Sequence, residues 1–292
     1  MKGNSRKKRK STIFRIFLIP LIAIMLVQSV ITIGTLVVRR TAATLEGYSS
    51  SMMSRLVENR RVILQNDMNQ RWSSVRDQAV PITNLLEEFL LAQDVGLAEL
   101  LRSGELKSGL LDLLFPVCLD ILHSNTTTGV FLILTGADMD LPGEYDGFFI
   151  RDSDPNTNPA NYTDLLLERG SKQLSRTWNV PLDTNWTTRF HMDGRGGSAA
   201  DSYFYEPWRA GAEYPDADTA DLGYWSPPFF LEKDGSDSYE MITYSLPLRY
   251  KGQVYGVLGV EISSRTLYDY FPVAELNVSQ QSGYMLAVRS GG

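Results

Sequence analysis

The sequence is poor in the residues that build disulfides and most metal centres. Its 292 residues contain one cysteine and two histidines. A disulfide needs two cysteines, and Cys118 is the single one, so an internal disulfide is excluded. A metal site with several cysteine ligands is excluded for the same reason. Cys118 lies in the apolar run 117–122, so we expect a small buried side chain. The histidines, His123 and His191, are far apart and have unlike neighbours.

Catalytic sequence motifs are also missing. The chain has no Gly-x-Ser-x-Gly elbow, no His-Glu-x-x-His helix and no phosphate-binding loop. The glycine-rich segment 194–198 lacks the flanking strand and helix of a nucleotide site. Aspartate pairs at 152/154, 216/218 and 234/237 lie in turn-like polar stretches, where solvation accounts for them. The sequence therefore predicts no enzyme and no cofactor, although a glycosidase-like acid pair stays open until geometry is known.

Charge is distributed unevenly along the chain. The formal net charge is −6, yet residues 2–10 are strongly basic. The remainder is therefore more acidic than the total suggests, which argues against nucleic acid as a partner.

No charged residue occurs between Ile16 and Val38. At 1.5 Å per residue this run is about 35 Å long, enough to cross a bilayer core. A cleaved signal peptide is the alternative, but the run is long and no small-x-small site precedes Arg39. We expect a cytoplasmic basic tail (1–12), a transmembrane helix (13–38) and a main domain outside the cell membrane.

Residues 39–95 are rich in helix formers, which predicts a long stalk helix. A heptad-like seam steps by three and four residues through Trp72, Val75, Ala79, Ile82, Leu86 and Phe89. The seam fits either a homodimeric coiled-coil stalk or a helix buried against its own domain. We favour the first for the amino-terminal half of the stalk and the second for the other half.

The segment 96–280 predicts one α+β module. We expect short helices over 96–122 broken at Gly104, Gly109 and Pro116, strands at 129–134 and 148–150, and a short helix at 162–169. Oxygen-bearing residues at 152–158 leave a calcium loop open. That loop departs from the EF-hand pattern, and an Asx-rich turn is the commoner structure.

The strongest local pattern is a β-hairpin. Two apolar runs, 239–248 and 253–262, flank a turn carrying Gly252. In the second run, period two predicts one face with Val254, Gly256 and Leu258 and an opposite face with Tyr255, Val257, Gly259 and Glu261. Gly259 is expected to leave space beside the carboxylate of Glu261.

These runs resemble the end of a Cache domain, an extracytoplasmic sensor module related to PAS. The resemblance is carried by Tyr224-Trp225-Ser226-Pro227, Ile242-Thr243-Tyr244-Ser245-Leu246-Pro247 and Gly256-Val257-Leu258-Gly259-Val260-Glu261-Ile262-Ser263. It implies a PAS-like antiparallel sheet after the transmembrane and stalk helices. It also implies a bacterial membrane receptor of the two-component or chemotaxis kind, with an output domain beyond residue 292. Residues 281–292 would then be the start of a second module or a truncated end.

The resemblance further implies a small-molecule pocket lined by the aromatic and basic segments 182–186 and 190–208, with the adjoining Arg189 and Arg209, and by the strands after them. The predicted ligand-binding residues are Tyr203, Tyr205, Trp208, Arg209, Tyr224, Trp225, Tyr244 and Glu261. An arginine would hold a carboxylate, and aromatic faces with Glu261 would hold an ammonium group. The arginine follows the tryptophan here, unlike in amino-acid-binding members, so an amino acid, a carboxylate or a similar molecule all remain possible ligands. Two other functions stay open for the chain: a membrane-anchored surface enzyme, and a structural protein whose aromatic residues only fill a core.

Overall fold

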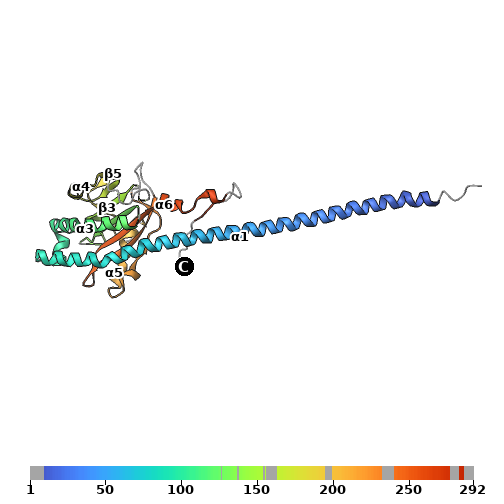
Figure 1. Ribbon diagram of the computed structural model, residues 1–292. Coiled ribbons are helices and arrows are strands. Elements are labelled where there is room, and N and C mark those ends of the chain that lie inside the picture. Colours follow the sequence, from blue (N-terminus) through green and yellow to red (C-terminus); the bar gives the residue numbers. More distant parts are fainter. Residues whose placement is uncertain are drawn as a thin grey trace, which may run out of the picture. The chain divides into compact units, whose positions relative to one another are not determined.

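The computed structural model describes residues 10–125, 127–136, 138–153, 155, 163–194, 199–231, 240–276 and 283–285. The chain divides into two units, residues 1–62 and 63–292. Helix α1 (Lys10–Gln93) contributes residues to both units (Figure 1).

The first unit consists of the amino-terminal part of α1. An 18-residue window of this helix has a mean hydropathy of 2.4, and by length and composition it can cross a membrane. Its large apolar side chains are exposed, from Phe17 at 75% to Val38 at 67%. In water such a surface would be strongly unfavourable, so a lipid environment suits this segment.

The second unit is built on a largely antiparallel sheet, as the sequence predicted. The described strands run in the order β5-β4-β3-β1-β10-β9-β7, and β8 also pairs with β9. Only the β4–β5 pair is parallel among these. The strands are β1 (Gly129–Leu134), β3 (Gly147–Asp152), β4 (Leu165–Arg169), β5 (Leu182–Thr187), β7 (Tyr224–Trp225), β8 (Phe229–Phe230), β9 (Glu240–Tyr250) and β10 (Gln253–Ser263).

One sheet face, called the helical face here, packs against α1, α2 (Leu97–Arg102) and α3 (Gly104–Asn125). Leu132, Ile150 and Leu258 point from the strands into the same core as Ile82 of α1 and Leu114 of α3. The second half of α1 and α3 run side by side over this face (Figure 1). The carboxy-terminal half of the predicted stalk is therefore buried within its own domain, as we expected.

The other face, called the pocket face, packs against α5 (Ser202–Glu213) and a small ribbon. That ribbon pairs β2 (Gly143–Tyr145) with β6 (Phe190–Met192). The core on this face is aromatic, and its rings pack edge to face or stacked at centroid distances of 5.0–6.1 Å. Its members include Phe131, Phe149, Phe190, Tyr203, Phe204, Tyr205 and Phe229.

The predicted hairpin is confirmed as β9 and β10. Its turn places Lys251 and Gly252 at φ values of 51° and 79°, the pair of positive angles that a type I′ turn requires. One detail of the prediction was wrong. A register shift between Val254 and Gly256 moves Tyr255 to the helical face, where its hydroxyl lies 3.3 Å from that of Thr83. A bulge adds a residue to one strand and so resets the alternation.

The predicted helix at 162–169 was also wrong, because residues 165–169 form β4. Leu165 and Leu167 alternate into the helical-face core, and β4 pairs with β3 and β5. Between Gly96 and Leu122 the helix breaks at Ser103 alone, since α3 continues through Gly109 and Pro116. Packing of α3 over the sheet outweighs the helix-breaking tendency of these two residues.

The remaining described elements are short. They comprise α4 (Lys172–Trp178), α6 (Ser264–Asp269) and the 3-10 turns η1 (Ala199–Asp201), η2 (Thr219–Leu222) and η3 (Val273–Leu276). Ser263 caps α6 by accepting a hydrogen bond from the Thr266 amide. The calcium alternative at 152–158 falls mostly outside the described residues. So does most of the segment 281–292, which was expected to start a second module; its described residues, 283–285, have no regular structure.

Candidate functional site

A cavity of about 410 Å³ opens on the pocket face, within the size range of small-molecule sites. Its walls are formed by strand ends, the β2–β6 ribbon, η1, α5 and the segment around β8. The described lining residues are Glu144, Arg169, Thr187, Arg189, Phe190, His191, Asp193, Ala200, Asp201, Tyr203, Phe229, Phe230 and Leu231.

Arg169 is the buried cation of this cavity, with 6% of its surface exposed. It ends β4, where pairing with Phe149 on β3 fixes its backbone. Its Nη1 donates to the backbone oxygens of Glu168 (2.8 Å) and Asn185 (3.0 Å). These two bonds hold the guanidinium in one orientation at the cavity wall.

Asp201 and two aromatic rings form another part of the wall. Asp201 ends η1 and accepts a hydrogen bond from the Asp193 amide at 2.8 Å. The rings of Tyr203 and Phe229 stack at a centroid distance of 5.0 Å. Burial, and then the nearby charge of Asp201, raise the pKa of the Tyr203 phenol. The phenol therefore stays neutral at physiological pH and can donate a hydrogen bond.

Charged groups of the β2–β6 ribbon also line the cavity. His191 Nδ1 lies 3.2 Å from Glu144 Oε1, and its Nε2 lies 3.9 Å from Asp193 Oδ1. These side chains are more than half exposed. His191 thus contacts carboxylates, and among the described lining residues no hydroxyl or thiol is hydrogen-bonded to it. This part of the cavity therefore shows no nucleophile–base pair.

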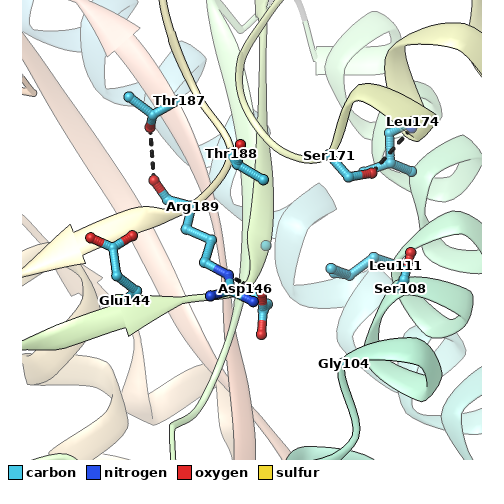
Figure 2. Close-up of a pocket in the computed structure, with 11 residues that line it drawn as sticks. Gly104, Ser108, Leu111, Glu144, Asp146, Ser171, Leu174, Thr187, Thr188 and Arg189 are labelled. Atoms are coloured by element: carbon cyan, nitrogen blue, oxygen red, sulfur yellow. Dashed lines mark hydrogen bonds and ion pairs between the residues drawn. The ribbon is translucent and has the colours of Figure 1, made fainter.

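A second cavity, of about 470 Å³, adjoins the first. Both are lined by Glu144, Thr187 and Arg189, so these residues lie between them. Figure 2 shows the Arg189 side chain extending toward Asp146, while Thr187 donates a hydrogen bond to the Arg189 backbone oxygen at 2.8 Å. The second cavity also reaches α3 at Gly104, Ser108 and Leu111.

Among the eight predicted ligand-binding residues, Tyr203 alone lines the first cavity. Tyr205 is buried in the aromatic core, with its hydroxyl 3.3 Å from that of Tyr145, and Trp208 packs against the same core. Arg209 is exposed and forms an ion pair with Glu206 one helical turn away. Tyr205 and Trp208 therefore fit the alternative that the aromatic residues fill a core.

The other predicted residues do not share one face of the sheet. Tyr244 is buried in the helical-face core, and Trp225 packs there at a ring distance of 5.1 Å. Tyr224 pairs with Ser245 and so points to the opposite face from Trp225. The eight residues therefore cannot all line one cavity.

Glu261 lies on the pocket face but is fully buried at a strand end. Thr128 Oγ1 donates to its Oε1 at 2.7 Å. The space expected beside Gly259 does not exist, because a Cβ there would lie 2.2 Å from the Phe131 ring. The Glu261 carboxylate instead occupies the room left by Gly129, across the β1–β10 pair, where a Cβ would lie 2.6 Å from Glu261 Oε2.

Sequence reasoning missed most of the cavity wall. Arg169 was placed in a helix, so its position on a sheet edge was not foreseen. Asp201 directly precedes the aromatic helix α5, and this position in the sequence could have indicated that it lies near the pocket. Arg189 and His191 belong to the aromatic and basic segment that the sequence highlighted, although neither was selected as a ligand-binding residue.

The first cavity combines arginine, carboxylate and aromatic groups. Guanidinium groups bind carboxylates through paired hydrogen bonds, and a carboxylate beside aromatic faces suits an ammonium group. The chemistry of the wall therefore fits a small molecule that carries charges of both signs.

Residues 186–269 match the family described as "Methyl-accepting chemotaxis protein-like, first PDC sensor domain". No curated protein matches the chain.

Similar solved structures include three from two Campylobacter jejuni chemoreceptors, Tlp1 and Tlp3. The periplasmic sensory domain of Tlp1 is 11% identical (TM-score 0.32), with 73% of this chain and 62% of that one covered. The sensory domain of Tlp3 is 16% identical (TM-score 0.31), with 72% and 65% covered. Another Tlp3 structure, of the ligand-binding domain in complex with L-norvaline, is 14% identical (TM-score 0.30), with 72% and 62% covered. The chain thus spans less than two thirds of each of these structures.

The matched segment supplies all the described lining residues of the first cavity except Glu144 and Arg169. The match of residues 186–269 to a PDC, or Cache, sensor-domain model confirms the resemblance found in the sequence.

Proposed function

We infer that this chain is the extracytoplasmic, ligand-sensing part of a single-pass membrane receptor, and that the first cavity binds a small zwitterion such as an amino acid. The observation that carries this inference is the cavity itself. It brings Arg169, Asp201 and Tyr203 to one wall, and the segment that matches the sensor family forms most of it.

The topology of the proposal follows from charge and hydropathy. The basic residues before the apolar run support an amino terminus in the cytoplasm and a sensor module outside. We propose that the stalk pairs two copies of the chain along its amino-terminal half. Residues 96–280 form the sensor module in this proposal, and no catalytic step belongs to this part of the chain.

Signalling in this proposal requires a ligand that binds two states of the module with different affinity. The second half of α1 forms part of the helical-face core, under the same sheet that carries the cavity on its other side. A change in the sheet therefore reaches α1 through direct packing contacts.

Thermal unfolding of the full chain in lipid nanodiscs tests the function. We would add the twenty proteinogenic L-amino acids, small carboxylates, primary amines and sugars one at a time. A ligand at a hundredfold its dissociation constant should add about 2.7 kcal/mol to the free energy of unfolding. For a domain of this size, this raises the melting temperature by several degrees.

Asp201→Asn locates the site. The amide keeps an oxygen that can accept from the Asp193 amide but removes the charge, so we expect a loss of affinity of about tenfold or more for a bound amine or amino acid. Asp221→Asn is the matched control, because Asp221 is exposed on η2 and does not line the cavity. If no compound shifts the melting temperature of the folded protein, the structural reading of the aromatic core gains support instead.

A further inference from the structure

Arg189 differs from Arg169 in how firmly it is held. Arg169 is buried and donates to two backbone oxygens, whereas the Arg189 side chain is 49% exposed. The described ion pair of Arg189 joins its Nε to Asp146 Oδ1 at 2.7 Å. Arg189 can therefore rotate at lower cost than Arg169.

Asp146, the ion-pair partner of Arg189, forms a second ion pair with another cation. The other carboxylate oxygen of Asp146 forms an ion pair with Lys107 Nζ of α3, and both side chains are under 20% exposed. If Arg189 turns away, Asp146 keeps Lys107 and is not left as a bare, half-buried charge. Removing the partner of a buried charge is costly, and this arrangement avoids that cost.

Arg189 also lies where a ligand would meet it. It lines both cavities, and Figure 2 shows its side chain crossing the region between Glu144 and Asp146. A carboxylate in either cavity would compete with Asp146 for the same guanidinium.

We propose that Arg189 is the ligand-carboxylate residue of the site and that it exchanges Asp146 for the ligand, which leaves Asp146 to Lys107. This rests on the proposed function and adds which arginine binds and what the exchange does. The ligand's carboxylate would thereby strengthen the attachment of the β2–β3 connection to α3. Helix α3 packs against α1, where Gly109 faces the Phe89 ring, so the exchange acts on the signalling helix pair.

Three substitutions in the full chain test the exchange: two should weaken binding of the amino acid and one should tighten it. The probes are the tightest-binding of the twenty L-amino acids and the primary amine that lacks its carboxylate, both measured by calorimetry. Arg189→Ala should weaken the amino acid by about tenfold or more and leave the amine unchanged. Asp146→Asn should tighten the amino acid, because the competing carboxylate is gone. Lys107→Met should weaken it, although Lys107 does not line either cavity.

A purely structural role for the three charges predicts another pattern. Every substitution would then weaken both probes, and Asp146→Asn would weaken the amino acid as well. That pattern, or unchanged amino-acid affinity in Arg189→Ala, overturns the exchange and leaves the proposed function standing. If none of the twenty amino acids binds the unaltered, folded protein, the amino-acid proposal and the exchange both fail.

Discussion

At the residue scale, Tyr255 shows how one bulge decides the chemistry of a side chain. The register shift turns its ring into the helical-face core, where it is fully buried. Burial raises the pKa of its phenol, and the hydrogen bond with Thr83 only partly offsets this. The folded protein therefore holds the phenol proton more tightly than the unfolded chain does.

This gives a prediction for alkaline stability. Because the folded pKa is raised, the stabilisation is complete below the unfolded pKa of about 10 and declines as the pH rises above it. Each buried tyrosine of this kind adds a slope of about 1.4 kcal/mol per pH unit. Tyr255→Phe should cost about 1 kcal/mol at pH 7 and make the decline between pH 10 and 11 shallower. Urea unfolding of the full chain in detergent at several pH values measures both effects.

Tyr268→Phe is the control for this prediction, because Tyr268 is 70% exposed. It should change neither the stability at pH 7 nor the alkaline slope. An unchanged slope in Tyr255→Phe would show that this phenol is not held neutral by the fold.

Single residues were predicted unevenly from the sequence. Cys118 is fully buried, as its apolar neighbours indicated. Tyr244 and Glu261 were grouped because both follow family-like patterns, but neighbouring strand positions alternate between faces. Tyr244 pairs with Val260, one position from Glu261, and so points the other way. Face assignment needs strand register, which short motifs do not contain.

At the element scale, the edge strands are joined by a charge cluster on the sheet. Arg151 of β3 forms ion pairs with Glu168 of β4 and Asp183 of β5, each at 3.0 Å. The two carboxylates are less than a tenth exposed. The guanidinium thus links three strands whose pairing carries Arg169 to the cavity.

Arg151→Ala should therefore destabilise the second unit by about 3–5 kcal/mol, because two mostly buried carboxylates lose their shared cation. Arg209→Ala is the matched control. Its ion pair with Glu206 is exposed on α5, so its loss should cost less than about 1 kcal/mol. Thermal melting of both variants measures the difference. Similar costs would mean that the cluster contributes no more than a surface pair.

Elements with strong periodicity were predictable, and elements defined by partners were not. The hairpin carries its turn residues and alternation in its own sequence, and it was confirmed. Strand β4 is five residues long, and its neighbours are β3 and β5. In a segment so short, the helical and strand patterns cannot be separated, and tertiary pairing decides.

At the scale of the whole molecule, the order of helix, long helix and antiparallel sheet was predictable because each part has its own composition. The sequence left two roles open for the stalk, a dimeric coiled coil and a helix buried against its own domain. For its second half the structure shows burial against the domain. Val75, Ile82, Leu86 and Leu90 of α1 are 5% exposed or less and belong to the helical-face core. The stalk is thus also a structural layer of the sensor.

Truncation distinguishes these roles of α1. Burying four such side chains contributes roughly 6–12 kcal/mol, comparable with the roughly 5–15 kcal/mol that stabilises a typical domain. A chain that begins at residue 97 should therefore not fold cooperatively. Chains that begin at residue 41 or residue 63 keep these side chains and should both fold cooperatively. Circular dichroism during heating measures this, and cooperative melting of the chain from residue 97 would show that the sheet does not need α1.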